Sequence, residues 1–142
     1  MLKTKNIEIV DHPMNAEEAL QAIGKVLQNA GSVTSQYIQN MIDSYHTMGP
    51  YFVIAPGIAL AHAKPDESVK ANDVALIVCK EPIVFQSHND PVHLLFGLCA
   101  TSSHNHMEVL VDMANLLSDE AKVNQIKHAT SKEKILEIIT QG

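Results

Sequence analysis

The 142-residue sequence contains no arginine, because all ten of its basic residues are lysines. Arginine is the side chain best shaped to hold a carboxylate or phosphate through two parallel hydrogen bonds. Any anion that this protein binds is therefore held by other donors, such as lysine, histidine, hydroxyl or backbone N–H groups. The 16 acidic residues outnumber the basic ones, which gives a net charge of −6, and no basic patch indicates a nucleic-acid partner.

The sequence also lacks a long apolar run. Lys, Asp, Glu, His or Asn interrupts every hydrophobic stretch, and the chain does not begin with a charged n-region and a cleavage site. We therefore expect a cytoplasmic protein that does not cross a membrane. With 46% hydrophobic residues, the chain has the size and composition of one domain, residues 1–142, built around one sizeable core.

Cysteine is scarce, with only Cys79 and Cys99, and each lies in an apolar run. In such a run a cysteine is most simply a buried core thiol. A disulfide and a nucleophilic cysteine are the alternatives, but neither cysteine has a partner residue near it in the sequence. We therefore expect both thiols to lie in the core.

One of the eight histidines, His62, follows an otherwise apolar hairpin. Residues 51–55 predict a strand, Pro56 and Gly57 predict a turn, and residues 58–61 predict a second strand. A single imidazole at the end of such a strand is placed to react. A buried structural histidine is the alternative, because histidine is commonly intermediate in burial.

A second histidine, His106, occurs in a comparable context. From Met107 onward, apolar residues recur at helical spacing, and Ser102 or Ser103 is a suitable N-cap. His106 would then lie in the first turn, where the helix dipole favours an anion and disfavours a second positive charge. A neutral imidazole that donates a hydrogen bond to a phosphate suits this position, and a core-facing helix residue is the alternative.

These residues carry a resemblance to a known family. The chain resembles the IIA components of the bacterial phosphoenolpyruvate-dependent sugar phosphotransferase system, of the mannitol/fructose type, over about residues 7–139. The stretches 49–57 and 89–92 resemble the ascorbate-type subgroup most closely. The motifs that match are Gly57-Ile-Ala-Leu-Ala-His62, for the phospho-accepting histidine, and His106-Met-Glu-Val-Leu with Ala114-Asn-Leu-Leu, for the second active-site histidine and its helix.

The resemblance implies a phosphoryl relay. His62 would receive a phosphoryl group from phospho-HPr and pass it to a cysteine of the cognate IIB component, while His106 stabilises the phosphate. We expect Nδ1–H of His62 to be held by a backbone carbonyl, so that Nε2 carries the phosphoryl group. A membrane IIC permease would take up the carbohydrate, expected to be L-ascorbate. No cofactor and no metal ion is expected, and both a monomer and a homodimer are compatible with the sequence.

Two departures from the family pattern bear on how phosphate is held. Proline usually precedes the phospho-accepting histidine, but Ala61 stands there, so the loop loses one backbone constraint. Mannitol-type proteins place an arginine shortly after a Met-Leu-Asp-like stretch, whereas Met41-Ile-Asp is followed here by Ser44. We therefore expect backbone N–H groups, His106, Lys64 and Ser44 to hold the phosphate.

The apolar residues Ile58, Leu60 and Met107 are expected to form the centre of a small transient interface that HPr and IIB occupy in turn. Two other functions compete with the relay. A regulatory module would use phosphorylation of the same histidine to switch binding to a kinase or a transporter. A zinc site would use His62 with His104 and His106, although a His-x-His at a helix start directs its two rings to different sides.

The order of elements predicts an α/β fold. Strands at 74–79 and 92–99 are apolar enough to be covered on both faces. We therefore expect a three-layer sandwich, in which a mixed, mostly buried β-sheet carries helices on both faces, and the resemblance implies the same fold. Further strands are predicted at 7–10, 51–55, 58–61 and 83–85, and helices are predicted to begin after Asn15, at Thr34 or Ser35, at Ser102 or Ser103, near Asp119 and at Thr130.

Overall fold

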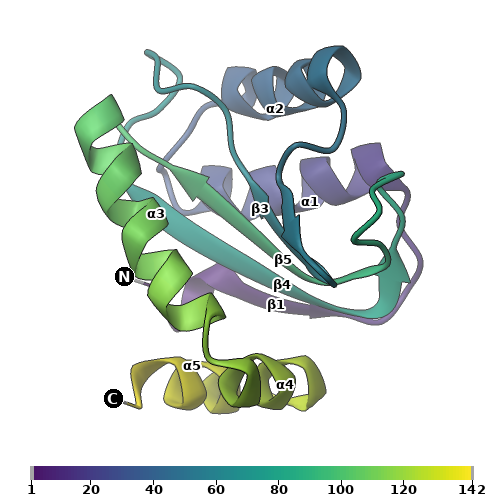
Figure 1. Cartoon of the computed structure of the whole chain (residues 1–142). Helices are drawn as coiled ribbons and strands as arrows, with labels where there is room; N and C mark the ends of the chain where they lie inside the picture. The colour runs from purple at the N-terminus through teal and green to yellow at the C-terminus, as the bar shows by residue number, and fades with distance from the viewer. Residues whose placement is uncertain (1, 142) are drawn as a thin grey trace.

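The computed structural model describes residues 2–141 and contains a five-stranded mixed β-sheet with helices on both faces (Figure 1). The order across the sheet is β1-β4-β5-β3-β2; the β1/β4 and β3/β5 pairs are parallel, and the β4/β5 and β2/β3 pairs are antiparallel. The predicted three-layer α/β sandwich is thereby confirmed. The strands are Ile7–Val10 (β1), Val53–Ala55 (β2), Ile58–Ala61 (β3), Asp73–Ile83 (β4) and Val92–Cys99 (β5).

The helices form the two outer layers. A short 3-10 helix, Thr4–Asn6 (η1), precedes β1, and helices Ala16–Asn29 (α1) and Ser35–Met48 (α2) cover one face of the sheet. Three helices at the carboxyl-terminal end of the chain cover the other face (Figure 1). They are Ser103–Leu117 (α3), Glu120–His128 (α4) and Lys132–Thr140 (α5).

Successive residues of the central strands point to opposite layers, as the pleat of a β-strand requires. On β5, Leu95 and Cys99 pack with residues of α1 and α2, whereas Leu94 and Phe96 pack with residues of α3, α4 and α5. All four residues of β3 are buried. The sheet is thus covered on both faces, which explains why its central strands are continuously apolar.

Helix α1 lies very close to the sheet. It begins after Asn15, as predicted, with a capping box in which Asn15 Oδ1 accepts from the Glu18 N–H at 2.9 Å and Glu18 Oε1 accepts from the Asn15 N–H at 3.0 Å. A Cβ atom on Gly97 of β5 would lie only 2.5 Å from Cγ1 of Ile23. Glycine at position 97 therefore lets α1 approach the strand that leads to the candidate site.

The hairpin of β2 and β3 has the predicted turn. Gly57 has φ of +78°, a backbone conformation that glycine adopts without the strain of a Cβ. The Gly57 N–H donates to the Asn89 carbonyl at 2.9 Å, and the Asn89 side chain donates to the Val53 carbonyl at 3.2 Å. The two stretches that resemble the ascorbate-type subgroup, 49–57 and 89–92, are therefore hydrogen-bonded to each other.

The expected short strand at 83–85 is not a separate element. Strand β4 continues to Ile83 through Pro82, with an irregular register between Val78 and Ile83. Proline has no N–H to donate, but it is tolerated where the ladder is irregular. Beyond β4, the Phe85 N–H donates to the Asp90 carboxylate at 3.1 Å instead of to a neighbouring strand. The prediction of a separate strand at 83–85 was therefore wrong.

Side-chain caps begin most helices where the sequence predicts them. Ser102 Oγ accepts from the Asn105 N–H at the start of α3, and Asp119 caps α4. The last helix was expected to be capped by Thr130, but Ser131 is its N-cap and accepts from the Lys134 N–H at 3.1 Å. The two candidates are adjacent hydroxyl residues, and their order in the sequence does not distinguish them.

Both cysteines are free and buried, as predicted. Burial raises the pKa of Cys79 and the pKa of Cys99 to about 12, so both thiols are protonated at neutral pH.

No helix within residues 2–141 has the length and apolar character needed to cross a lipid bilayer.

Candidate active site

The two histidines singled out in the sequence meet at one edge of the sheet. Strands β3 and β5 are parallel neighbours, with Ala61 opposite Gly97, so their carboxyl ends point to the same edge. His62 directly follows β3, and His106 lies on α3, which begins four residues after β5 ends. The two rings have centroids 5.1 Å apart and planes inclined by 56°. Residues far apart in the sequence thus form one site.

The ring of His62 has a defined orientation. Its Nδ1 lies 2.7 Å from the carbonyl oxygen of Leu60, two residues earlier in the chain. A carbonyl oxygen only accepts hydrogen bonds, so Nδ1 carries the proton and donates it. The lone pair therefore lies on Nε2. The hydrogen bond expected for Nδ1 is present, and the ring is half-buried.

His106 is half-buried on the facing side of the site. Burial, followed by the proximity of His62, lowers the pKa of His106, so its ring is neutral at neutral pH. Its Nδ1 atom is buried and has no hydrogen-bond partner among residues 2–141. An unpartnered buried polar atom is uncommon in folded proteins, and a hydrogen bond to a ligand atom would satisfy it.

The first turn of α3 offers fewer free amides than expected. The His106 N–H donates to the Ser102 carbonyl at 2.9 Å, and the Asn105 N–H donates to Ser102 Oγ at 3.2 Å. Both amides are therefore already used within the helix and its cap. The imidazole of His106, rather than its backbone amide, is the group that can reach toward His62.

Two tyrosines that the sequence did not single out hold the backbone beside His62. Tyr51 Oη donates to the His62 carbonyl at 2.6 Å, and its ring meets the His62 ring edge to face at 5.4 Å between centroids. Tyr37 Oη accepts from the Ala63 N–H at 2.9 Å and donates to the Leu98 carbonyl at 2.8 Å. Tyr37 is fully buried, and a buried phenol needs a hydrogen-bond partner, which is the signal by which the sequence could have pointed to it.

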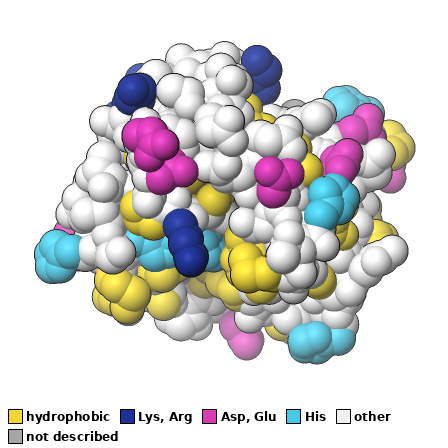
Figure 2. All heavy atoms as spheres, turned by 90° about the horizontal axis from the view of Figure 1, so that it is seen from above, with side chains coloured by type: hydrophobic (Ala, Val, Ile, Leu, Met, Phe, Trp, Pro, Cys, Tyr) yellow, Lys and Arg dark blue, Asp and Glu magenta, His cyan; other side chains and the backbone are white. Residues whose placement is uncertain are grey.

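A hollow of about 740 Å³ opens beside the two histidines. Figure 2 shows histidine side chains (cyan) and a lysine (dark blue) together in this part of the surface, bordered by hydrophobic and acidic groups. The predicted site residues Ser44, Lys64 and Met107 all line the hollow, and Lys64 is its one lysine. The lining residues are Asn40, Asp43, Ser44, Thr47, Met48, Tyr51, His62, Ala63, Lys64, Pro65, Asp66, Ser103, His106 and Met107.

Two of the residues predicted for a partner interface are not on the surface. Ile58 is 5% exposed and Leu60 is 3% exposed, and both pack in the core between the sheet and the layer of α3, α4 and α5. They cannot form the centre of a docking surface, so this part of the prediction was wrong. Met107 is 59% exposed, and Met48 and Tyr51 are further exposed apolar residues at the hollow.

The arrangement of histidines required by the zinc alternative does not form. His104 is highly exposed, and its Nε2 lies 3.0 Å from the Glu108 carboxylate, one turn along α3. It is not among the residues that line the hollow beside His62. Within the described part of the chain, no group of three or more His, Cys, Asp or Glu side chains is placed to hold a metal ion.

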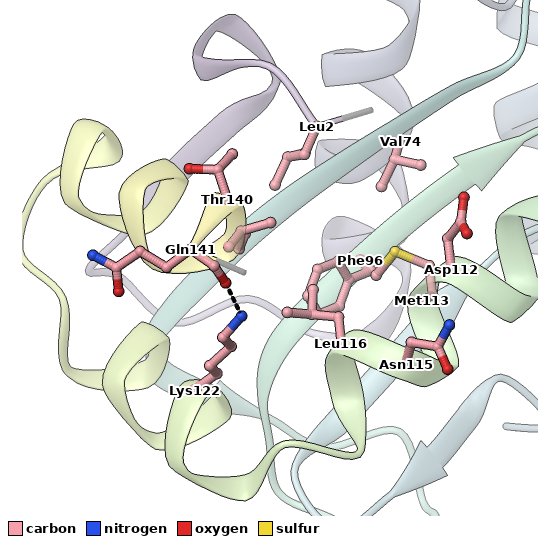
Figure 3. Close-up of a pocket in the computed structure, with 11 residues that line it drawn as sticks. Leu2, Val74, Phe96, Asp112, Met113, Asn115, Leu116, Lys122, Thr140 and Gln141 are labelled. Atoms are coloured by element: carbon pink, nitrogen blue, oxygen red, sulfur yellow. Dashed lines mark hydrogen bonds between the residues drawn. The ribbon is translucent and has the colours of Figure 1, made fainter.

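A second hollow, of about 340 Å³, lies between the sheet and the carboxyl-terminal helices (Figure 3). Its floor is apolar, with Phe96, Met113 and Leu116, and at its edge Lys122 donates to the Gln141 carbonyl. None of its lining residues belongs to the first hollow. It contains neither histidine nor cysteine, and we assign no chemistry to it.

Comparison with known proteins adds independent information. The family model described as "Phosphoenolpyruvate-dependent sugar phosphotransferase system, EIIA 2" matches residues 1–142. The chain is also 31% identical over 141 residues to the ascorbate-specific PTS system EIIA component of Escherichia coli (strain K12). That alignment covers 98% of this chain and 92% of the relative.

Solved structures agree with these sequence matches. The fold is similar to the solution structure of the mannitol-specific cryptic phosphotransferase enzyme IIA CmtB from Escherichia coli, with a TM-score of 0.90 and 26% identity over 99% of this chain and 96% of that one. It is also similar to the complex of enzyme IIAMTL and phosphorylated enzyme IIBMTL from Escherichia coli. There the TM-score is 0.85 and the identity is 25%, over 98% of this chain and 96% of the matched chain.

Proposed function

Because this chain belongs to the EIIA 2 family of the phosphoenolpyruvate-dependent sugar phosphotransferase system, we propose that it carries its phosphoryl group on Nε2 of His62. Members of this family are phosphotransferase components. The observation that carries the assignment is the 2.7 Å hydrogen bond from Nδ1 to the Leu60 carbonyl. It leaves the lone pair on Nε2, the ring nitrogen that is free to act as a nucleophile.

The relay consists of two substitutions at phosphorus. In the first, the lone pair of His62 Nε2 forms a bond to the phosphorus of phospho-HPr while the nitrogen–phosphorus bond of the donor breaks, and the electron pair returns to the donor imidazole. In the second, a cysteine thiolate of IIB forms a sulfur–phosphorus bond, and the pair returns to Nε2. Such transfers depend mainly on positioning and charge stabilisation, which is what a fixed ring orientation supplies.

His106 is assigned the stabilisation of the phosphate. Its ring faces His62 at 5.1 Å between centroids, and it has an unpartnered buried nitrogen that a phosphate oxygen would satisfy. The lowered pKa of His106 supports a neutral ring, which donates one hydrogen bond without also repelling a cationic partner. A positioned donor of this kind stabilises the negative charge on the oxygens of the transferring phosphoryl group in the transition state.

Lys64 and Ser44 take over the part that arginine plays in related proteins. Both line the hollow that holds the two histidines. Of the nearby carboxylates, Asp66 is engaged by its own neighbours, since it accepts from Ser68 N–H at 2.8 Å and from the Asn40 side chain at 3.0 Å. The ammonium of Lys64 therefore remains available to neutralise a phosphate as a point charge.

HPr and IIB are proposed to dock in turn over the hollow. Met48, Tyr51 and Met107 form an exposed apolar surface at its rim and replace the buried Ile58 and Leu60 in that role. Such a surface suits the weak, transient contacts of a relay that releases each partner. One solved neighbour is a complex with a phosphorylated IIB, which supports IIB as the second partner of this protein.

We place the protein in the cytoplasm, where it serves a membrane IIC permease.

We propose L-ascorbate as the carbohydrate whose uptake this protein supports. The sequence relatives that support this choice are ascorbate-specific EIIA components, whereas the structural neighbours described above are mannitol-type. The protein itself contacts only phosphoryl carriers in the relay. The substrate is therefore set by the IIB and IIC components with which it works.

The test of the carrier role is labelling by phospho-HPr. The wild-type protein should take up one labelled phosphoryl group, and His62→Gln should take up none while keeping a native circular dichroism spectrum and melting temperature. The adduct should be lost in mild acid and survive base, as a phosphoramidate does. Stoichiometric label in the His62→Gln variant, or a base-labile and acid-stable adduct, would contradict the assignment.

The substrate and the regulatory alternative are tested by growth. Deletion of the gene should abolish growth on L-ascorbate, and the phosphorylated protein should donate rapidly to the matching IIB alone. Normal growth on ascorbate with a defect on a hexitol or a ketose would overturn the substrate and keep the carrier role. Normal growth on every carbohydrate would favour the regulatory module.

A further inference from the structure

The peptide unit between His62 and Ala63 is held at both ends by tyrosine hydroxyls. Its carbonyl oxygen accepts from Tyr51 Oη at 2.6 Å, and its N–H donates to Tyr37 Oη at 2.9 Å. The two tyrosines come from different segments, since Tyr37 lies in α2 and Tyr51 lies between α2 and β2. Because the peptide is planar, hydrogen bonds on its opposite edges oppose its rotation and so restrain the ψ angle of His62.

This double attachment occurs where another constraint is absent. Ala61 occupies the position before His62, so no proline ring restricts the backbone on that side. Ala61 is still the last residue of β3, opposite Gly97, and the sheet holds the chain up to that point. The next peptide unit has no strand partner and is held instead by the two tyrosine hydroxyls, which we call the tyrosine clamp.

The tyrosine clamp and the side-chain hydrogen bond act on the same residue. The bond from His62 Nδ1 to the Leu60 carbonyl is short-range, so it forms only if the backbone between these residues keeps its shape. The edge of the Tyr51 ring also packs on the imidazole at an interplanar angle of 83°. Backbone and ring are therefore restrained together, and Nε2 is left as the ring nitrogen with a free lone pair.

We propose that Tyr51, with Tyr37, is a positioning residue of the relay: its hydroxyl holds the His62 carbonyl and so keeps Nε2 aligned for phosphoryl transfer. This inference rests on the proposed role of His62. Tyr51 does not touch the phosphoryl group in this scheme; it acts through His62. Tyr37 contributes more than Tyr51 to the stability of the fold, because it is fully buried and also donates a hydrogen bond to the Leu98 carbonyl at the end of β5.

The test removes one hydroxyl and keeps the ring. In Tyr51→Phe, the aromatic contact with His62 is retained and the hydrogen bond to the carbonyl is lost. We expect kcat for label uptake from phospho-HPr to fall about tenfold, with KM for phospho-HPr unchanged, because one neutral hydrogen bond is removed from the positioned state. Nitrogen NMR shifts of the His62 ring should show the Nε2–H tautomer becoming populated beside the Nδ1–H form.

Helix α2 offers a matched control, Tyr45. Tyr45 Oη also donates to a backbone carbonyl, that of Phe85, at 3.0 Å, and its ring neighbours are His46, Phe52 and Phe85 rather than His62. Tyr45→Phe should change the melting temperature by an amount comparable with Tyr51→Phe and leave the transfer rate and the His62 tautomer as in the wild type. A further variant, Tyr51→Leu, should be slower than Tyr51→Phe, because it also loses the ring.

The outcomes separate this inference from the carrier role. If the wild type accepts label and Tyr51→Phe matches it in kcat and in tautomer, Tyr51 is only a surface residue and the inference is overturned. If Tyr45→Phe is slowed as much as Tyr51→Phe, the effect is one of general stability, which also overturns it. If the wild type takes no label, the carrier role falls, and the tautomer measurement alone then decides whether Tyr51 orients the ring.

Discussion

The helices on the two faces of the sheet differ in how many of their residues are buried. In α1, five of 14 residues are buried, and the helix contacts both β4 and β5. In α3, only two of 15 residues are buried, Val109 and Met113. Since buried apolar area provides most of the stabilisation of a packed helix, the layer of α1 and α2 is the firmer one.

Each layer contributes one half of the active site. The firm layer supplies Tyr37, which holds the backbone next to His62, whereas the less buried α3 carries His106. In the proposed relay, the nucleophile would thus be held by the more buried layer and the phosphate stabiliser would be carried by the less buried one. In the proposed relay, a phosphoryl group on His62 would add volume and charge to the hollow beside α3, the less buried of the two helices.

A pair of leucines measures the difference between the layers most directly. Leu27 in α1 is fully buried, whereas Leu110 in α3 is only partly buried. Leu27→Ala should lower the free energy of unfolding by about 3 kcal/mol, because it leaves a cavity, and Leu110→Ala should lower it by about 1 kcal/mol. Denaturant unfolding of both variants provides the measurement, and equal losses would remove the distinction between the two layers.

His106→Ala separates chemistry from packing within the less buried layer. The variant should still be phosphorylated on His62, but transfer onward to the IIB cysteine should be slower by ~10²-fold, the loss typical of one positioned donor. Its melting temperature should change little, because the ring is only half-buried. A variant that melts earlier, with an unchanged transfer rate per folded molecule, would instead make His106 a packing residue.

Tyr37→Phe tests how the firm layer holds the site. The variant leaves the Leu98 carbonyl and the Ala63 N–H without their phenol partner in the core. Unfolding should become easier by about 2 kcal/mol, because a buried polar group without a partner is costly. Hydrogen exchange at the Ala63 amide should rise more than exchange in α3. If hydrogen exchange rose more in α3 than at the Ala63 amide, Tyr37 would not be what holds the backbone beside His62.

The smallest expected effect is on the acid side of the stability curve. Burial lowers the pKa of His106, and burial together with Lys127 and His128 lowers the pKa of His93 from the usual 6.5. The unfolded chain therefore binds protons before the folded protein does as pH falls, so stability is greatest above pH 6.5 and declines below it. His106→Gln should flatten this decline in urea titrations at successive pH values, and an unchanged slope would contradict the lowered pKa.

Much of the fold could be predicted because it depends on local patterns. The apolar spacing of α1, its capping box at Asn15 and Glu18, and the apolar strand at 92–99 are each visible within a short window of sequence. The interruption of a pattern was harder to interpret. The predicted strands at 74–79 and 83–85 leave out residues 80–82, but an irregular ladder accommodates these residues, Pro82 included, within β4.

The two histidines of the candidate site could be predicted from the sequence, but the residues that hold and surround them could not. The resemblance to the IIA family paired His62 with His106, and the structure brings them together because β3 and β5 are parallel neighbours. The burial of Ile58 and Leu60 depends on helices more than 40 residues later in the chain, which cover that face of β3. The bonds from Tyr37 and Tyr51 to residues 62–63 likewise depend on tertiary packing, which sequence spacing does not encode.

The absence of arginine makes the positive charge of this protein chemically uniform. Every cationic side chain other than histidine is a primary amine, and Lys64 is the one that lines the hollow beside the histidines. Acetylation neutralises an amine, whereas methylation keeps its charge, and neither reaction acts in the same way on a guanidinium. The charge of the lysine that lines this hollow can therefore be removed by acylating one nitrogen atom, or kept when the same atom is alkylated.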